Sequence, residues 1–156
     1  MSAFSGISDS EYQELKHAIS YITILVAGAD DHIDEEEKKW AEKLTNIRSY
    51  ASDETLQSFY DDVGANFSDI LHNLIEELPD NAKERNVILG DRLSKLNDIL
   101  PKLDNKIGAT LYESYTSFAK HVAKASGGFL RFFSISGVEK EVVDLPMVNE
   151  IVFEEE

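Results

Sequence analysis

Apolar residues recur along the chain at spacings of three and four, which is the period of one face of an α-helix. From Ser8 this pattern predicts a first helix that ends near Gly28, with a buried stripe of Tyr12, Leu15, Ile19, Ile22 and Val26. The same spacing predicts a second helix that fades near Tyr50 and carries Trp40, Ala41, Leu44, Ile47 and Ala51. An acidic loop joins these two amphipathic helices.

The same period continues through the middle of the chain. A third helical region follows the N-cap residues Ser52 and Asp53, has Gly64 as a point of interruption, and ends at residues 79–81. Its shared face contains Leu56, Phe59, Tyr60, Val63, Phe67, Ile70, Leu71, Leu74 and Leu78. A fourth helix before Pro101 carries Val87, Ile88, Leu93, Leu96, Ile99 and Leu100, and a fifth carries Ile107, Leu111, Tyr115, Phe118, Val122 and Ala125.

Strand patterns are scarce. Only residues 141–144 and 148–153 can be argued as extended, and Pro146 more simply marks a break between short helices. The chain has 156 residues, a length that suits one domain. We therefore predict an all-α bundle of about six to seven helices, spanning 1–156 as a single domain, with a frayed N-terminal arm at 1–7 and a frayed acidic tail at 154–156.

Charge narrows the range of partners. The 30 acidic and 15 basic residues give a formal net charge of -15, so nucleic acids and anionic lipid surfaces are repelled. There is no cysteine, which excludes disulfides and thiolate ligands. No secretory signal or apolar run long enough to span a membrane is present, so we expect a cytoplasmic protein. The partners that remain are cations and proteins with a basic surface.

The loop between the first two predicted helices is the densest acidic cluster. Asp34 is placed to cap the second helix in a capping box with Glu37, and acidic residues in a first turn favour the helix dipole. Asp30 and Asp31 instead follow the C-terminus of the first helix, where an added carboxylate is unfavourable. Because negative charge at this position destabilises the helix, we infer that a positive ion lies among these carboxylates.

We therefore predict a divalent cation site formed by Asp30, Asp31, Asp34 and Glu37. Carboxylate oxygens suit Ca²⁺ or Mg²⁺, whereas His32 would also admit Mn²⁺ or Zn²⁺. The loop is not an EF-hand, because Glu35 stands where the turn needs glycine and Ala41 where the bidentate glutamate belongs. The competing interpretation is a solvated, merely capped loop.

A second copy of this pattern follows the fifth helix. Residues 26–37 can be laid over 122–139, where Ser136 and Glu139 form a second capping-box pattern. The run Ala27–Glu37, together with 125–127, Ile135, Ser136 and Glu139, resembles the signature of the TerB-like tellurite-resistance family. The resemblance implies an all-helical fold of two related helix-loop-helix halves, an ion-binding acidic surface at the four carboxylates named above, and a non-enzymatic role in bacterial stress or tellurite-resistance systems.

This chain departs from the family pattern at three places. Asp31 replaces the loop glycine, Ser126 replaces the second aspartate, and residues 129–134 lengthen the second loop. We therefore expect no second ion site.

Two other pairs of residues are alternative candidates for a metal site. Glu14 with His17, and Asp69 with His72, repeat the carboxylate–imidazole spacing of di-iron bundles. On a helical wheel all four side chains lie off the buried stripes, so we predict that they point to water and hold no iron. No catalytic triad pattern or nucleotide-binding motif is present, so we expect no enzyme.

The loop at 126–134 combines glycines with Phe129, Phe132 and Phe133. These aromatic residues either cap the core or anchor a protein partner, with self-association as one use of the surface. The leading hypothesis is thus an acidic, TerB-like protein that binds a divalent cation and acts in ion sensing, buffering or complex assembly. The alternative is a metal-free interaction module that uses the acidic surface and this phenylalanine-rich loop.

Overall fold

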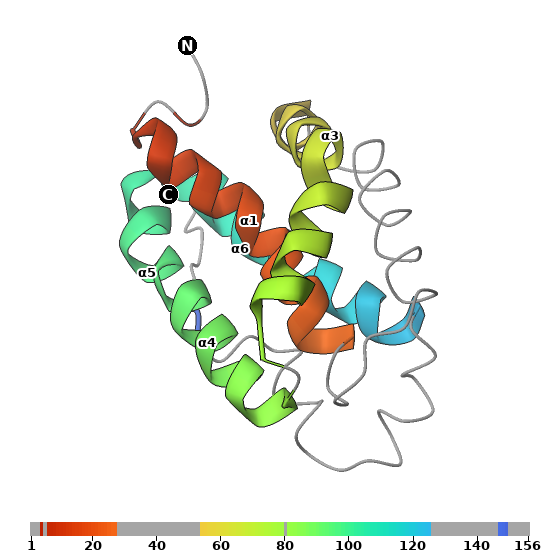
Figure 1. The fold of residues 1–156 in the computed structure, drawn as a ribbon. Helices are drawn as coiled ribbons and strands as arrows, with labels where there is room; N and C mark the ends of the chain where they lie inside the picture. Colours follow the sequence, from red (N-terminus) through yellow and green to blue (C-terminus); the bar gives the residue numbers. More distant parts are fainter. Residues whose placement is uncertain (1–3, 5, 28–53, 80, 126–146, 150–156) are drawn as a thin grey trace.

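The computed structural model describes Phe4 and residues 6–27, 54–79, 81–125 and 147–149 (Figure 1). These residues form α1 (Asp9–Ala27), α3 (Glu54–Glu77), α4 (Ala82–Ser94), α5 (Leu96–Ile99), the 3₁₀ helix η1 (Leu100–Lys102) and α6 (Asn105–Ala125). No strand occurs within these ranges, so the all-α prediction is confirmed for them. The predicted helix at 40–51 lies outside the described residues, and the two-half organisation stays a prediction.

Helix α1 is the centre of the described bundle. It contacts α3, α4, α5 and α6. In Figure 1, α3 and α4 flank it on opposite sides, and α6 runs along it in the same direction. The second half of α1 is consequently buried on every face, from Ala18 to Leu25. The sequence predicted a single buried stripe, whereas a helix surrounded by four others has little free face.

Hydroxyl groups in the core connect α1 and α3 to α6. The Tyr115 hydroxyl donates a hydrogen bond of 2.8 Å to the backbone carbonyl of Leu15. The hydroxyls of Tyr60 and Ser114 also form a hydrogen bond. Both tyrosine side chains are almost completely buried. Because a buried hydroxyl without a partner is costly, these bonds fix how the helices lie against one another.

Helix α3 runs without a break through Gly64, which was expected to interrupt it. Gly64 is exposed. The buried face of α3 comprises Leu56, Phe59, Tyr60, Val63, Phe67, Leu71 and Leu74, and Leu78 after the helix end is also buried. Since this apolar face is continuous on both sides of the glycine, packing against α1 outweighs the weak helix propensity of one residue.

The predicted fourth helix is divided in the structure. The chain turns at Lys95, so that α4, α5 and η1 follow one another, and Asn81 caps α4 by accepting a hydrogen bond of 3.0 Å from the Glu84 amide. The prediction that Val87 belongs to the buried stripe is wrong, because its side chain is 68% exposed. Val87 lies two residues, about 200°, from the fully buried Leu89, and therefore faces the opposite way.

Both ends of the described chain pack against the helices. Phe4 belongs to the arm for which we expected fraying, yet its ring lies 5.1 Å from that of Tyr12 and 5.7 Å from that of Phe59, between centroids. Near the other end, the Asn97 side chain donates to the Met147 carbonyl at 3.0 Å and accepts from the Asn149 amide at 2.6 Å. Val148, between these two residues, is buried.

Among the described helices, none is both long enough and apolar enough to cross a membrane.

Candidate functional site

All residues of the two predicted sites lie outside the described part of the chain. These are the cation ligands Asp30, Asp31, Asp34 and Glu37, and the partner-binding Phe129, Phe132 and Phe133. The structure does describe the helices that lead into both segments. Within the described ranges, no group of three or more histidines, aspartates or glutamates is placed to hold a metal ion.

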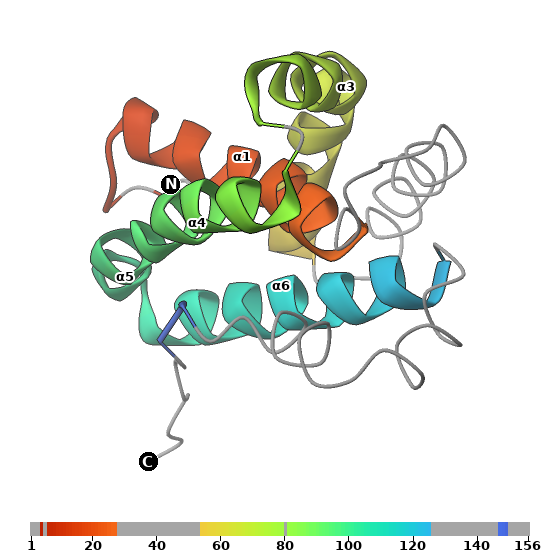
Figure 2. The same cartoon turned by 60° about the horizontal axis from the view of Figure 1, so that its bottom comes forward.

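Helix α1 ends at Ala27, shortly before Asp30 and Asp31 in the chain. Its last turn contains no basic residue, so no cationic side chain of α1 itself offsets the partial negative charge of the terminal carbonyls. Helix α6 runs parallel to α1 and ends at Ala125 at the same end of the bundle (Figures 1 and 2). Lys124 lies in the last turn of α6. The C-termini of α1 and α6 therefore share the end of the bundle from which the acidic loop continues, and of these two last turns only that of α1 is without a basic residue.

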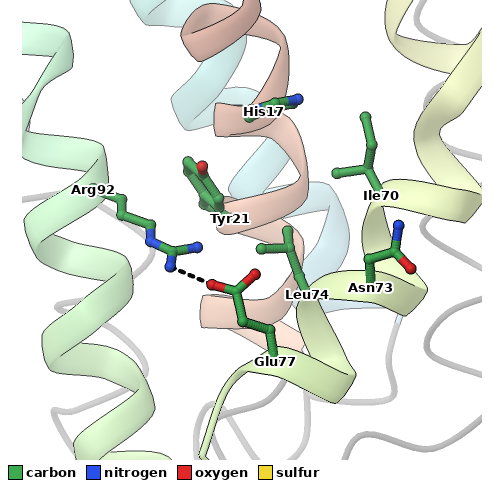
Figure 3. A pocket seen from close by; sticks show the side chains of 7 residues that line it. All are labelled: His17, Tyr21, Ile70, Asn73, Leu74, Glu77 and Arg92. Carbon is green, nitrogen blue, oxygen red and sulfur yellow. Dashed lines mark hydrogen bonds and ion pairs between the residues drawn. The ribbon is translucent and has the colours of Figure 1, made fainter.

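A separate feature is a cleft of about 250 Å³ between α1, α3 and α4 (Figure 3). Its lining residues come from all three helices: His17, Tyr21, Ile70, Asn73, Leu74, Glu77 and Arg92. The cleft forms because α3 and α4, although consecutive, each pack on α1 and lie on opposite sides of it.

An ion pair joins the two walls of the cleft. Arg92 Nη2 of α4 lies 2.6 Å from Glu77 Oε1 of α3, and the side chains are 27% and 57% exposed. The Arg92 guanidinium carbon also lies 5.7 Å from the centre of the Tyr21 ring, within range of a cation–π contact. The hydrogen bond to Glu77 raises the pKa of Arg92, and burial is the main cause that raises the pKa of Tyr21. Arg92, whose guanidinium donates to the Tyr21 hydroxyl, partly opposes the shift in the pKa of Tyr21.

His17 does not point to water, contrary to the prediction. Its side chain is half-buried in the cleft, and its ring meets that of Tyr21 edge to face with centroids 6.3 Å apart. Burial lowers the pKa of His17, while the nearby Glu14 partly opposes that shift. The helical-wheel prediction was wrong because α3 and α4 pack on either side of α1 and cover positions outside the predicted buried stripe. His17 and Tyr21 are four residues apart, and this spacing in the sequence indicates that the two rings lie next to each other on one face of the helix.

The other carboxylate–imidazole pair behaves as predicted. Asp69 and His72 are exposed on α3. Since His17 lies in the cleft while this second pair faces solvent, the described residues do not assemble the two inward-facing pairs that a di-iron site needs.

Comparison of the chain with protein-family models, curated proteins and solved structures gave no match. The resemblance to the TerB-like family therefore rests on the short motifs around residues 27–37 and 125–139.

Proposed function

We propose that this chain is a non-enzymatic, acidic helical protein that binds a divalent cation through Asp30, Asp31, Asp34 and Glu37. The observation that carries the proposal is the end of α1 at Ala27 with no basic residue in its last turn. The two aspartates that follow sit where the helix dipole disfavours negative charge, and no cation from α1 compensates them. A bound metal ion supplies the missing positive charge.

The surroundings of this helix end support the same conclusion. The C-termini of the parallel helices α1 and α6 bring their partial negative charges to one end of the bundle (Figure 2), where Lys124 is the basic residue in the last turn of α6. The net charge of -15 attracts cations from a distance. Four carboxylates offer the hard oxygen ligands that favour Ca²⁺ or Mg²⁺, while His32 keeps Mn²⁺ and Zn²⁺ as candidates.

Occupancy of this site would connect two structural elements. Asp30 and Asp31 follow α1, whereas Asp34 and Glu37 belong to the start of the next predicted helix. An ion bound by both pairs fixes the angle between these elements, so that ion binding is read out as a change in the surface offered to a partner. This is the basis for ion sensing or complex assembly, and the TerB-like resemblance suggests a bacterial stress or tellurite-resistance setting.

Calorimetric titration of the full chain with Ca²⁺, Mg²⁺, Mn²⁺ and Zn²⁺ tests the proposal. We expect saturable heat from at least one ion, and its loss in the double variant Asp30→Asn/Asp31→Asn. The matched control is Asp61→Asn/Asp69→Asn, which removes the same charge from exposed positions on α3. Unchanged heat in the first variant would refute the assigned ligands. Absence of heat from all four ions would favour the metal-free interaction module with Phe129, Phe132 and Phe133 as anchors.

A further inference from the structure

We propose that the cleft between α1, α3 and α4 binds a small zwitterion of the α-amino-acid type with an apolar side chain. The inference rests on the cleft residues alone and is independent of the cation site.

The charges in the cleft are complementary to a zwitterion. Among its lining residues only Glu77 and Arg92 carry formal charge, with opposite signs, and both side chains are partly accessible. A ligand carboxylate can take the bidentate donors of Arg92 while a ligand ammonium group donates to Glu77, so one ion pair is replaced by two. An anion or a cation alone would exchange the existing ion pair for a single new one, without the second charge-assisted contact that a zwitterion makes.

The remaining lining residues carry no formal charge, and the nearby Glu14 of α1 adds a negative charge that acts on His17 and Tyr21. Burial lowers the pKa of His17 and raises the pKa of Tyr21, so both side chains are neutral near pH 7. Asn73 contributes an uncharged amide. The whole chain carries a net charge of -15, which further disfavours a ligand with net negative charge.

Size and apolar surface favour an aliphatic side chain on the ligand. A volume of about 250 Å³ is below the range of roughly 300–1,000 Å³ that is usual for drug-sized ligands. Leu74 and the Tyr21 ring supply apolar surface next to the ion pair, and Ile70 adds apolar surface farther along α3 (Figure 3). A leucine-sized side chain would lie against them while its charged end meets Arg92 and Glu77.

Nuclear magnetic resonance titration of the full, isotope-labelled chain with L-leucine tests this inference. We expect saturable shifts of resonances from His17, Tyr21 and Arg92. Leucinamide lacks the carboxylate and 4-methylpentanoate lacks the ammonium group, so each should bind at least about tenfold more weakly than leucine. Equal binding of 4-methylpentanoate would refute the zwitterion assignment. No shift from leucine up to its solubility would refute the site altogether.

Substitutions locate the contacts. Glu77→Gln and Arg92→Gln should each weaken leucine binding by about tenfold or more. The matched controls Glu76→Gln and Lys95→Gln change the same charges at exposed neighbouring positions and should leave the affinity unchanged. Leucine affinity that is the same in Glu77→Gln as in the unsubstituted chain would overturn the proposal. The ligand series above needs no substitution, so it decides the question even if a variant fails to fold.

The cation site and the cleft can be tested separately. Leucine titration in the presence of a chelator, and with Asp30→Asn/Asp31→Asn, should give the same affinity as the unsubstituted chain. Loss of leucine binding in these two conditions would contradict the independence of the sites, whereas loss of metal binding alone concerns only the proposed function.

Discussion

Gly6 and Gly90 differ in what surrounds the position that a β-carbon would take. At Gly6 a β-carbon would lie 2.6 Å from the backbone oxygen of Lys102, a contact that requires the backbone to move. At Gly90, within α4, nothing lies within 4 Å. The first glycine permits the N-terminal segment to approach η1 closely, whereas the second serves no packing purpose among the described residues.

We expect Gly90→Ala to stabilise the protein by about 0.5–1 kcal/mol, because alanine restricts the unfolded chain and favours the helix. Thermal unfolding should show a rise of roughly 2–4 °C for each kcal/mol in a chain of this size. Gly6→Ala is the opposite control and should lower the melting temperature. A melting temperature of Gly90→Ala at or below that of the unsubstituted chain would contradict the open surroundings of this position.

At the scale of an element, the start of α1 shows how a local motif and a distant contact combine. Ser8 and Glu11 form a capping box, in which the Glu11 amide donates to the Ser8 hydroxyl at 3.1 Å and the Ser8 amide donates to the Glu11 carboxylate at 3.0 Å. The second carboxylate oxygen accepts from Lys102 Nζ at 2.7 Å. The bond to Lys102 is the main cause that holds the pKa of Glu11 below its usual value. The cap thus also ties α1 to η1.

Ser8→Ala should lower the free energy of unfolding by about 1 kcal/mol, within a range of roughly 0.5–2 kcal/mol, since it removes an acceptor for an otherwise unpaired helix amide. Chemical denaturation followed by circular dichroism measures this change. Ser10→Ala removes a hydroxyl at an exposed position inside the same helix and should have a smaller effect. Equal losses in the two variants would argue against the capping role of Ser8.

At the scale of the whole molecule, the burial of His17 on α1 makes the free energy of unfolding depend on pH. Three helices meet around the cleft, where Tyr21 of α1 lies next to Arg92 of the Glu77–Arg92 pair and His17 lines the same cleft. Burial lowers the pKa of His17 in the folded protein. The unfolded chain, with an ordinary histidine pKa of about 6.5, therefore binds a proton before the folded protein does.

This difference predicts a loss of stability on mild acidification. The stability that the protein has with His17 neutral is fully present above a pH of about 6.5. The free energy of unfolding then decreases as the pH falls from there through the lowered pKa of His17 in the folded state. We expect His17→Gln to reduce the slope of the free energy of unfolding against pH in this window, measured by urea denaturation at several pH values. His72→Gln makes the same substitution at an exposed position. If both variants keep the slope of the unsubstituted chain, His17 is not the group responsible.

The sequence predicted the helices of the described chain largely because helix periodicity is a local property. The stripes containing Leu15, Ile19 and Ile22, and Leu111, Tyr115 and Phe118, are buried as their spacing indicated. The Ser8–Glu11 capping box follows the same sequence pattern as the boxes predicted at residues 34–37 and 136–139, so it too is encoded locally. The acidic loop was predicted from charge order alone, and its placement lies outside the described residues.

Only the tertiary structure decided which helix faces are covered and which distant groups meet. Periodicity gives the direction of one stripe but not the number of neighbours, so it missed the complete burial of residues 18–25. The exposure of Val87, in contrast, follows from local helix geometry, because Val87 lies opposite Leu89 on α4. The contacts of Tyr115 with Leu15, Asn97 with Met147, and Arg92 with Glu77 join residues that are separated along the chain. The sequence alone determined most of the helices in the described ranges, because helix periodicity depends on near neighbours, and it determined the net charge, which depends only on composition. The cleft and its ion pair depend on how the helices cross, and that is fixed only when the core packs.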